Sequence, residues 1–199
     1  MPETEMTGNI FYLARRETNV GTKAATQAEK VTAEALLVER VCGGDSAAFG
    51  ELYRIFAPLV HGIILARVPR GEVEDLVQEV FLSAFKNAAS LRNRNAVGAW
   101  LVMIARHRAV EFYRQAKPTE EISEDLSSNT GDNTQTEARE ILAAIRALPE
   151  TYCETLVLRL VEGMTGQEIA ERTGLKPESV RVNLHRGMKL LREKLGIEE

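Results

Sequence analysis

The final third of the chain carries two segments with helical spacing that are separated by a glycine, and this pattern restricts the fold more than any other feature. The first segment, residues 165–173, places Ile169 and Ala170 on one inner face. Gly174 follows as a turn residue, and Pro177 favours the first turn of a second helix. The second segment repeats apolar side chains at helical spacing, at Val180, Leu184, Met188, Leu191 and Leu195.

The opposite face of this second segment is mostly polar. A short helix, a tight turn and a longer helix with such a face predict a helix-turn-helix, whose second helix enters the major groove of DNA. An ordinary helical hairpin with a solvated charged face would give the same pattern, so the rest of the chain must distinguish the two. The residues on this face are Glu178, Val182, His185, Arg186 and Lys189.

The composition favours helices throughout. With only 14 glycines and 6 prolines in 199 residues, and abundant alanine, leucine, glutamate and arginine, the chain is expected to be all-α. No apolar run approaches membrane-spanning length and the N-terminus lacks the apolar core of a secretion signal, so we expect a cytoplasmic protein with no direct membrane insertion. Cys42 and Cys153 have no metal-binding spacing and are expected to be reduced, buried thiols.

The net charge of −4 hides two basic segments that flank an acidic one. Residues 86–117 contain seven Lys or Arg and one acidic residue, and residues 176–194 contain six basic and two acidic residues. Between them, residues 118–140 contain seven Asp or Glu and one Arg. Because phosphates respond to local fields rather than to the mean charge, this distribution is compatible with nucleic-acid binding.

Polarity and periodicity divide the chain into four parts. Residues 1–30 are polar and weakly patterned, which predicts a disordered extension, and the apolar cluster at 10–13 is either a docking motif or a locally apolar tail. Residues 31–117 form a helical module, residues 118–136 an acidic flexible linker, and residues 137–199 the helix-turn-helix module. The expected fold is therefore all-α, with two small helical domains joined by a flexible linker.

Apolar spacing and capping residues predict the individual helices of these modules. In the first module, Asp45 is expected to cap a helix, and residues 73–86 and 99–115 form two more. In the second module, residues 141–148 form a helix ended by a proline, and residues 155–161 form the next one.

The predicted helix at 73–86 has one face on which a large apolar side chain stands among polar ones. Leu82 projects from this polar stripe, whereas the other apolar residues gather on the opposite face. Such a stripe suits a protein-docking surface, and a solvated face with one exposed leucine is the equal alternative. The stripe consists of Asp75, Gln78, Glu79, Leu82 and Lys86, and the opposite face of Leu76, Val77, Val80, Phe81, Ala84 and Phe85.

A loop rich in arginine and asparagine precedes the only tryptophan of the chain. Its basic groups attract phosphate, and its amides suit hydrogen bonds to an unstacked base. Trp100 begins the following helix, where its ring either wedges against an opened base pair or belongs to the core. Arg106, His107 and Arg114 extend one side of that helix. The loop residues are Arg92, Asn93, Arg94 and Asn95.

Two patterns in the first module resemble region 2 of bacterial sigma factors of the sigma-70 family, and residues 148–159 and 163–191 resemble region 4. The resemblance covers about residues 35–195 and is closest to the small extracytoplasmic-function group, which keeps only these two regions. It implies a non-enzymatic factor that binds core RNA polymerase, recognises minus-35 and minus-10 promoter elements and aids DNA strand opening. The two patterns are Asp75-x-x-Gln78-Glu79-Val80-Phe81-Leu82 and Trp100-Leu101-x-x-Ile104-Ala105-Arg106.

The resemblance also implies roles for individual residues, and it implies an anti-sigma factor as a third partner besides core polymerase and promoter DNA. The polymerase-docking residues are Asp75, Gln78, Glu79 and Leu82. The minus-10 residues are Arg92, Asn93, Arg94, Asn95, Trp100, Arg106, His107 and Arg114. The minus-35 residues are Ser179, Arg181, Val182, His185, Arg186 and Lys189.

Several positions depart from the usual pattern of this family. His107 stands where asparagine is usual, and Val182 and Asn183 replace a frequent serine and a frequent arginine. A valine cannot hydrogen-bond a base edge, although it can touch a thymine methyl group. The promoter sequence therefore cannot be copied from better-known relatives.

A free-standing helix-turn-helix repressor or activator is the main alternative, with residues 31–117 as a sensing or dimerisation domain. Such a regulator binds duplex DNA alone, whereas a sigma factor binds promoters well only together with core polymerase. An enzyme is disfavoured because the chain has no phosphate-cradling glycine loop, no HExxH motif and no cysteine cluster. We therefore expect no catalytic residues, no bound metal and no cofactor.

Overall fold

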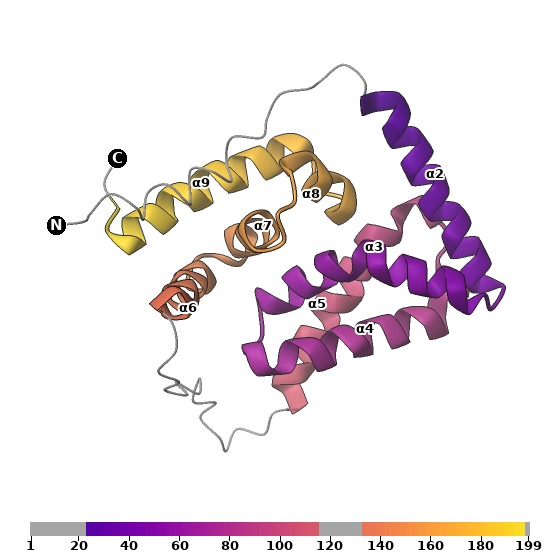
Figure 1. The fold of residues 1–199 in the computed structure, drawn as a ribbon, viewed down its shortest axis with the longest axis horizontal. Helices are drawn as coiled ribbons and strands as arrows, with labels where there is room; N and C mark the ends of the chain where they lie inside the picture. Colours follow the sequence, from indigo (N-terminus) through magenta and orange to yellow (C-terminus); the bar gives the residue numbers. More distant parts are fainter. Residues whose placement is uncertain (1–22, 116–132, 198–199) are drawn as a thin grey trace.

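The computed structural model describes residues 23–115 and 133–197, and all regular elements in these two ranges are helical, as predicted (Figure 1). Four α-helices form a first module and four more form a second. The first module contains α2 (Lys23–Cys42), α3 (Ser46–Leu65), η1 (Arg70–Glu72), α4 (Val73–Asn87), η2 (Ala88–Ser90), η3 (Arg94–Ala96) and α5 (Val97–Gln115). The second contains α6 (Asn133–Arg146), α7 (Glu150–Leu160), α8 (Gly166–Thr173) and α9 (Pro177–Leu195).

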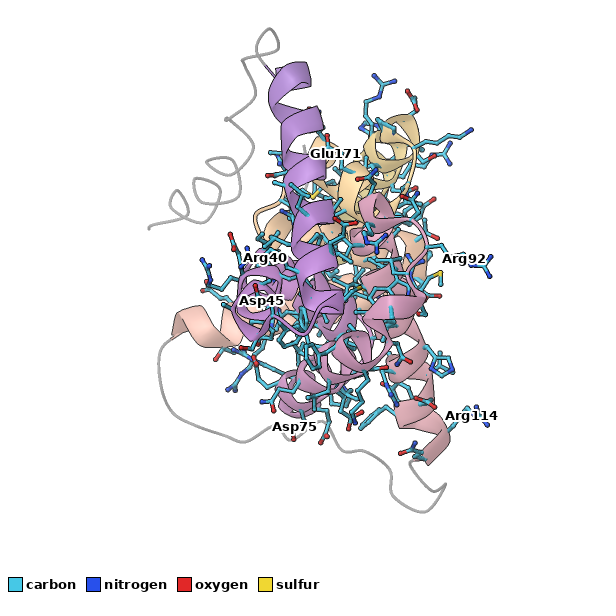
Figure 2. All side chains as sticks on the ribbon, turned by 90° about the vertical axis from the view of Figure 1, so that its right-hand side faces the viewer. Arg40, Asp45, Asp75, Arg92, Arg114 and Glu171 are labelled. Atoms are coloured by element: carbon cyan, nitrogen blue, oxygen red, sulfur yellow. The ribbon has the colours of Figure 1, made fainter. Side chains whose placement is uncertain are left out.

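Helix α3 is the central helix of the first module, and its start is fixed by the predicted cap. The carboxylate of Asp45 accepts hydrogen bonds from the backbone amides of Ala47 at 2.9 Å and Ala48 at 3.0 Å. Arg40, near the end of α2, donates to the same carboxylate at 2.9 Å, so one side chain joins two helices (Figure 2). Helices α2, α4 and α5 pack around α3. Its largest fully buried side chains are Phe56, Leu59, Val60, Ile63 and Ile64.

Helix α3 also has the length and composition of a membrane-spanning helix, which corrects the expectation that no segment of the chain reaches that length. Half of this stretch is buried against other parts of the protein. A helix that is surrounded by neighbouring helices carries apolar residues around most of its circumference, just as a helix in lipid does. The central position of α3 therefore accounts for its apolar composition.

The second module contains the predicted helix-turn-helix, formed by α8 and α9. Thr165 begins α8 with a capping box, in which its hydroxyl accepts from the Glu168 amide and the Glu168 carboxylate accepts from the Thr165 amide. Gly174 ends α8 at φ +75°, a conformation that favours glycine. Pro177 opens α9, as its fixed φ angle suggests.

Several helix starts differ from the sequence prediction, and α5 begins at Val97 rather than at residue 99. Helix α7 begins at Glu150 rather than at residue 155, because Pro149 both ends the preceding turn and takes the N-cap position of the next helix. Helix α2 begins inside the predicted extension, and α6 begins inside the predicted linker. Helices propagate readily from a packed segment into polar sequence. The apolar cluster at 10–13 and the stretch 116–132 lie outside the described residues.

The two modules pack against each other along α3 with α7 and α5 with α8, a contact that the sequence did not predict. Two glycines permit this close approach. A Cβ atom on Gly62 of α3 would lie 2.7 Å from a methyl group of Leu158. A Cβ atom on Gly98 of α5 would lie 2.6 Å from the backbone oxygen of Arg172. Backbone cannot move aside as a flexible side chain can, so a larger residue at Gly98 would separate the modules.

We expect Thr165→Ala to lower the free energy of unfolding by about 1 kcal/mol, because the Glu168 backbone amide loses its hydroxyl acceptor. Thr165→Ser is the matched control, since serine keeps the hydroxyl. Urea unfolding followed by circular dichroism measures both values. Equal stability of the alanine and serine variants would show that the capping box adds nothing to the fold.

Candidate functional site

The predicted stripe on α4 is exposed along its length, while the opposite face of the helix is buried. Asp75, Gln78, Glu79 and Leu82 all face solvent, and 56% of the Leu82 surface is exposed. Figure 2 shows Asp75 projecting from one end of the molecule. A large apolar side chain thus stands among groups that hydrogen-bond, as the helical spacing predicted.

One residue was placed on the wrong face of α4. Phe85 was expected in the core but is exposed over 41% of its surface. It lies 60° around the helix from Leu82, at the edge of the apolar arc, where periodicity alone does not decide burial. Its ring packs edge-on against Phe49, with the ring centroids 4.8 Å apart. Phe85 therefore extends the apolar part of the stripe beyond Leu82.

The arginine- and asparagine-rich loop is folded by its own side chains. The side-chain oxygen of Asn93 accepts from the Asn95 amide at 3.2 Å and so shapes the turn into η3. Arg94 leans toward α2, where its Nε lies 3.7 Å from a carboxylate oxygen of Glu39. That nitrogen is buried and makes no hydrogen bond. Arg92 points away from the body of the molecule (Figure 2), so the loop divides into an exposed part and a part held by α2.

Helix α5 presents the other predicted minus-10 residues in different ways. Trp100 is half-buried and packs against the core, so its ring is partly engaged in the fold. His107 and Arg114 are exposed, and the His107 ring lies 3.5 Å from the Glu111 carboxylate. Arg114 projects on the same side of the molecule as Arg92 (Figure 2).

Two apolar residues on this face of α5 were missed by sequence reasoning. Met103 and Val110 are exposed over 63% and 57% of their surfaces. They lie four residues before and three residues after His107, so they share its face of the helix. Helical spacing places both residues beside His107, but spacing alone does not show that apolar side chains are exposed.

The fourth predicted residue of α5, Arg106, is bound by the second module. Its guanidinium donates to both carboxylate oxygens of Glu154 on α7, at 2.9 and 2.7 Å. These hydrogen bonds raise the pKa of Arg106. Only 6% of Glu154 is exposed, and the same carboxylate contacts Arg67 at the end of α3 at 2.5 Å. A buried carboxylate therefore lies between two arginines of the first module.

A second set of contacts holds the C-terminal end of α3. Arg146 of α6 donates to the backbone oxygens of Leu65 at 3.0 Å and Val68 at 2.9 Å. The Cys153 thiol donates to the Ala66 oxygen at 3.4 Å. The last carbonyls of a helix lack partners within it and attract positive charge. The second module thus caps the central helix of the first.

The two cysteines differ in exposure. Cys153 is buried as expected, and burial raises the pKa of its thiol to about 11. Cys42 is exposed, which corrects the expectation of a buried thiol. It is the last residue of α2, where the chain turns toward α3 and no neighbour covers it completely. Within the described ranges, no group of three or more His, Cys, Asp or Glu side chains is placed to hold a metal ion.

A third contact between the modules contains the half-buried His61 of α3. Its Nδ1 lies 2.6 Å from a carboxylate oxygen of Glu162, just after α7, and its Nε2 lies 3.8 Å from Glu74 of α4. The hydrogen bond to Glu162 raises the pKa of His61, and the two carboxylates outweigh the opposing effects of burial and of Arg70. His61 therefore joins the modules most strongly when it is protonated.

The exposed face of α9 contains all six predicted minus-35 residues. Its buried face holds the predicted apolar residues, and Asn183 lies with them at 9% exposure. Asn183 thus cannot be a base-reading residue, because its position in the helix turns it inward. Val182, beside it, is exposed. The exposed residues are Ser179, Arg181, Val182, His185, Arg186 and Lys189.

Known proteins resemble this chain over most of its length. Residues 52–119 match the family model for sigma-70 region 2, and residues 138–191 match the model for sigma-70 region 4. The RNA polymerase sigma factor CarQ of Myxococcus xanthus is 31% identical over 166 residues, which cover 80% of this chain and 95% of CarQ. The ECF RNA polymerase sigma-E factor of Haemophilus influenzae is 30% identical over 186 residues, covering 84% and 97%.

A solved structure shares the fold. CnrH, in complex with the cytosolic domain of CnrY, superposes with a TM-score of 0.58 at 22% sequence identity. The match covers 84% of this chain and 99% of CnrH.

We expect the packing of the modules to weaken as the pH rises through the raised pKa of His61. The stabilisation that protonated His61 gives to the packed state is fully present below the ordinary histidine pKa of about 6.5. It is lost as the pH rises through the raised pKa. The free energy of unfolding, followed by Trp100 fluorescence, should therefore fall as the pH rises from about 6.5 through the raised pKa, and more steeply in the wild type than in His61→Gln. Glu162→Gln should flatten the same slope. Identical slopes in all three proteins would exclude His61 as the titrating group.

Proposed function

Because this chain belongs to the sigma-70 family, we propose that its first module docks on core RNA polymerase and reads the minus-10 element, while its second module reads the minus-35 element. Proteins of this family bind core polymerase and DNA and direct transcription initiation as a non-catalytic subunit. They are generally cytoplasmic, and we propose the same location for this chain. The remaining question is which residues carry each role.

The exposed Leu82 on α4 is the observation that carries the docking proposal. Its stripe offers a central apolar contact flanked by the carboxylates of Asp75 and Glu79 and the amide of Gln78. Protein interfaces combine an apolar centre with a hydrogen-bonding rim in this way. Phe85 adds aromatic area at the edge of the stripe. A free-standing regulator would use such a face for sensing or dimerisation, so binding to core polymerase distinguishes the two proposals.

The minus-10 element is read, in this proposal, by the exposed part of the loop and by the outer face of α5. Extruding a base from a duplex costs a few kcal/mol, roughly, unless stacking and hydrogen bonds compensate. The exposed amides of Asn93 and Asn95 supply hydrogen bonds, and Arg92 and Arg114 supply phosphate contacts. Met103 and Val110, flanking His107, add apolar area against which unstacked bases can lie.

The minus-35 element is read by the exposed face of α9. Arg181 and Arg186 project from its first half, on the side of the helix that the module leaves open. Arginine pairs with the acceptor edge of guanine, and Val182 can pack against a thymine methyl group. Since Asn183 is buried, the specificity lies in the residues on either side of it.

An anti-sigma factor is proposed as a third partner. The observation that supports it is the solved CnrH structure, in which a chain of the same fold is bound to the cytosolic domain of CnrY. A partner of this kind would have to cover at least one of the three exposed faces described above. If that partner competes with core polymerase for binding to this chain, its binding site includes the α4 stripe.

We expect the double variant Asp75→Asn with Gln78→Ala to bind core polymerase about thirtyfold more weakly, a loss of about 2 kcal/mol, because the stripe loses one charge and one amide that hydrogen-bond the partner. Glu72→Gln is the matched control, since Glu72 is an exposed carboxylate directly before α4 and outside the stripe. Surface-immobilised core polymerase measures the affinities, and circular dichroism verifies the helices. Unchanged affinity of the double variant would remove the docking role from α4.

We expect Arg186→Ala to reduce discrimination between a cognate and a scrambled minus-35 element by about 1–3 kcal/mol in polymerase–promoter binding. Lys194→Ala is the control, because Lys194 is an exposed cation in the last turn of the same helix. An equal loss on cognate and scrambled DNA would mean that Arg186 contacts phosphate and reads no base.

A further inference from the structure

The arginine- and asparagine-rich loop before Trp100 rests with both of its ends against α2. Val38 and Val41 of α2 line an apolar hollow together with Ala88, which precedes the loop, and Val97, which follows it. All four side chains are buried. The short helices η2, just before the loop, and η3, which includes its second half, also contact α2. Helix α2 therefore fixes where the loop begins and ends.

Between these ends, the side chains of the loop point in two directions. Arg92, Asn93 and Asn95 are exposed, and Arg92 projects away from the body of the molecule (Figure 2). Arg94 is half-buried and leans toward α2, where its Nε lies 3.7 Å from a carboxylate oxygen of Glu39. That nitrogen is shielded from solvent and has no hydrogen-bond partner among the described residues. Arg94 is therefore joined to α2 by charge, at a distance too long for a hydrogen bond.

We propose that Glu39 and Arg94 are positioning residues, which hold the loop in the shape that lets Asn93 and Asn95 read an unstacked base, and that Arg94 itself makes no contact with DNA. This inference rests on the proposed minus-10 role of the loop and adds the contact that supports its specificity. A loop that is already ordered loses less entropy when it binds. Polar groups that a supporting contact holds in place also adapt less to a wrong base, which increases discrimination between bases.

Glu39 distinguishes positioning from simple electrostatics, because the two effects have opposite signs. Glu39 carries a negative charge beside a loop that is proposed to bind DNA. If charge alone mattered, Glu39→Gln would remove a repulsion and tighten binding to every DNA sequence. If Glu39 holds the loop, the same variant weakens binding to the preferred sequence only.

The experiment binds a randomised single-stranded DNA library to core polymerase reconstituted with the full chain, and sequencing of the bound fraction identifies the preferred sequence. The ratio of affinities for this sequence and for its single-base mismatches measures discrimination. We expect Glu39→Gln to lower this ratio about threefold, or about 0.7 kcal/mol, which is within the range of an exposed ion pair. Glu72→Gln is the matched control, since it removes the same charge at the opposite end of α4 from the loop. An unchanged ratio in Glu39→Gln, or tighter binding to all sequences, would overturn the proposal.

Two arginine variants separate positioning from phosphate contact within the loop itself. Arg92→Ala removes an exposed cation, so it should weaken binding to all sequences alike and reduce the slope of log affinity against log salt concentration by about 0.7. Arg94→Ala should leave that slope unchanged and lower the affinity ratio about threefold, as Glu39→Gln does. A reduced slope with an unchanged ratio in Arg94→Ala would make Arg94 a phosphate contact and contradict its positioning role.

Exchange of the two charges tests whether the pair acts as a unit. Glu39→Arg and Arg94→Glu each place like charges side by side and should lower the ratio, whereas the double variant restores the attraction and should recover most of it. A double variant that is no better than the single ones would overturn the proposal. If the wild type with core polymerase selects no sequence from the library, the proposed minus-10 role fails. If it selects one and all variants discriminate equally well, only the positioning role fails.

Discussion

The buried carboxylate of Glu154 is the interaction on which the arrangement of the whole molecule depends. A charge this deeply buried needs close partners of opposite sign, because removing one partner leaves an uncompensated charge in the interior. Its partners belong to the first module, Arg67 in the turn after α3 and Arg106 on α5, whereas Glu154 belongs to the second module. The ion pairs therefore form only when α7 lies against α3 and α5. Gly62 and Gly98 allow this packing, because a side chain at either position would collide with Leu158 of α7 or with the backbone of Arg172 in α8.

This packing determines which faces of the molecule remain available. The α4 stripe and the outer face of α9 are exposed in the packed state, whereas α5 is exposed only in part. The half-buried His61 makes the packing of the modules sensitive to pH, because its hydrogen bond to Glu162 strengthens on protonation. One set of contacts thus decides which faces of the two modules are exposed.

Sequence reasoning predicted the features that local chemistry decides. The cap at Asp45, the turn at Gly174 and the two faces of α4 depend on residues only a few positions apart, and the structure confirms them. Sequence reasoning could not predict features that depend on contacts between residues far apart in the chain. The engagement of Arg106 by Glu154 joins residues 48 positions apart, and the burial of Asn183 and exposure of Cys42 depend on which neighbours cover them. Contact between the modules was missed for the same reason.

The central claim is that this chain gives core RNA polymerase its promoter specificity. Run-off transcription with reconstituted core polymerase, combined with mapping of start sites, tests it most directly. The account predicts defined transcripts that require the chain and core polymerase together, from promoters sharing a minus-10 and a minus-35 element. Specific binding of duplex DNA by the chain alone, with no association with core polymerase and no dependent transcript, would contradict it.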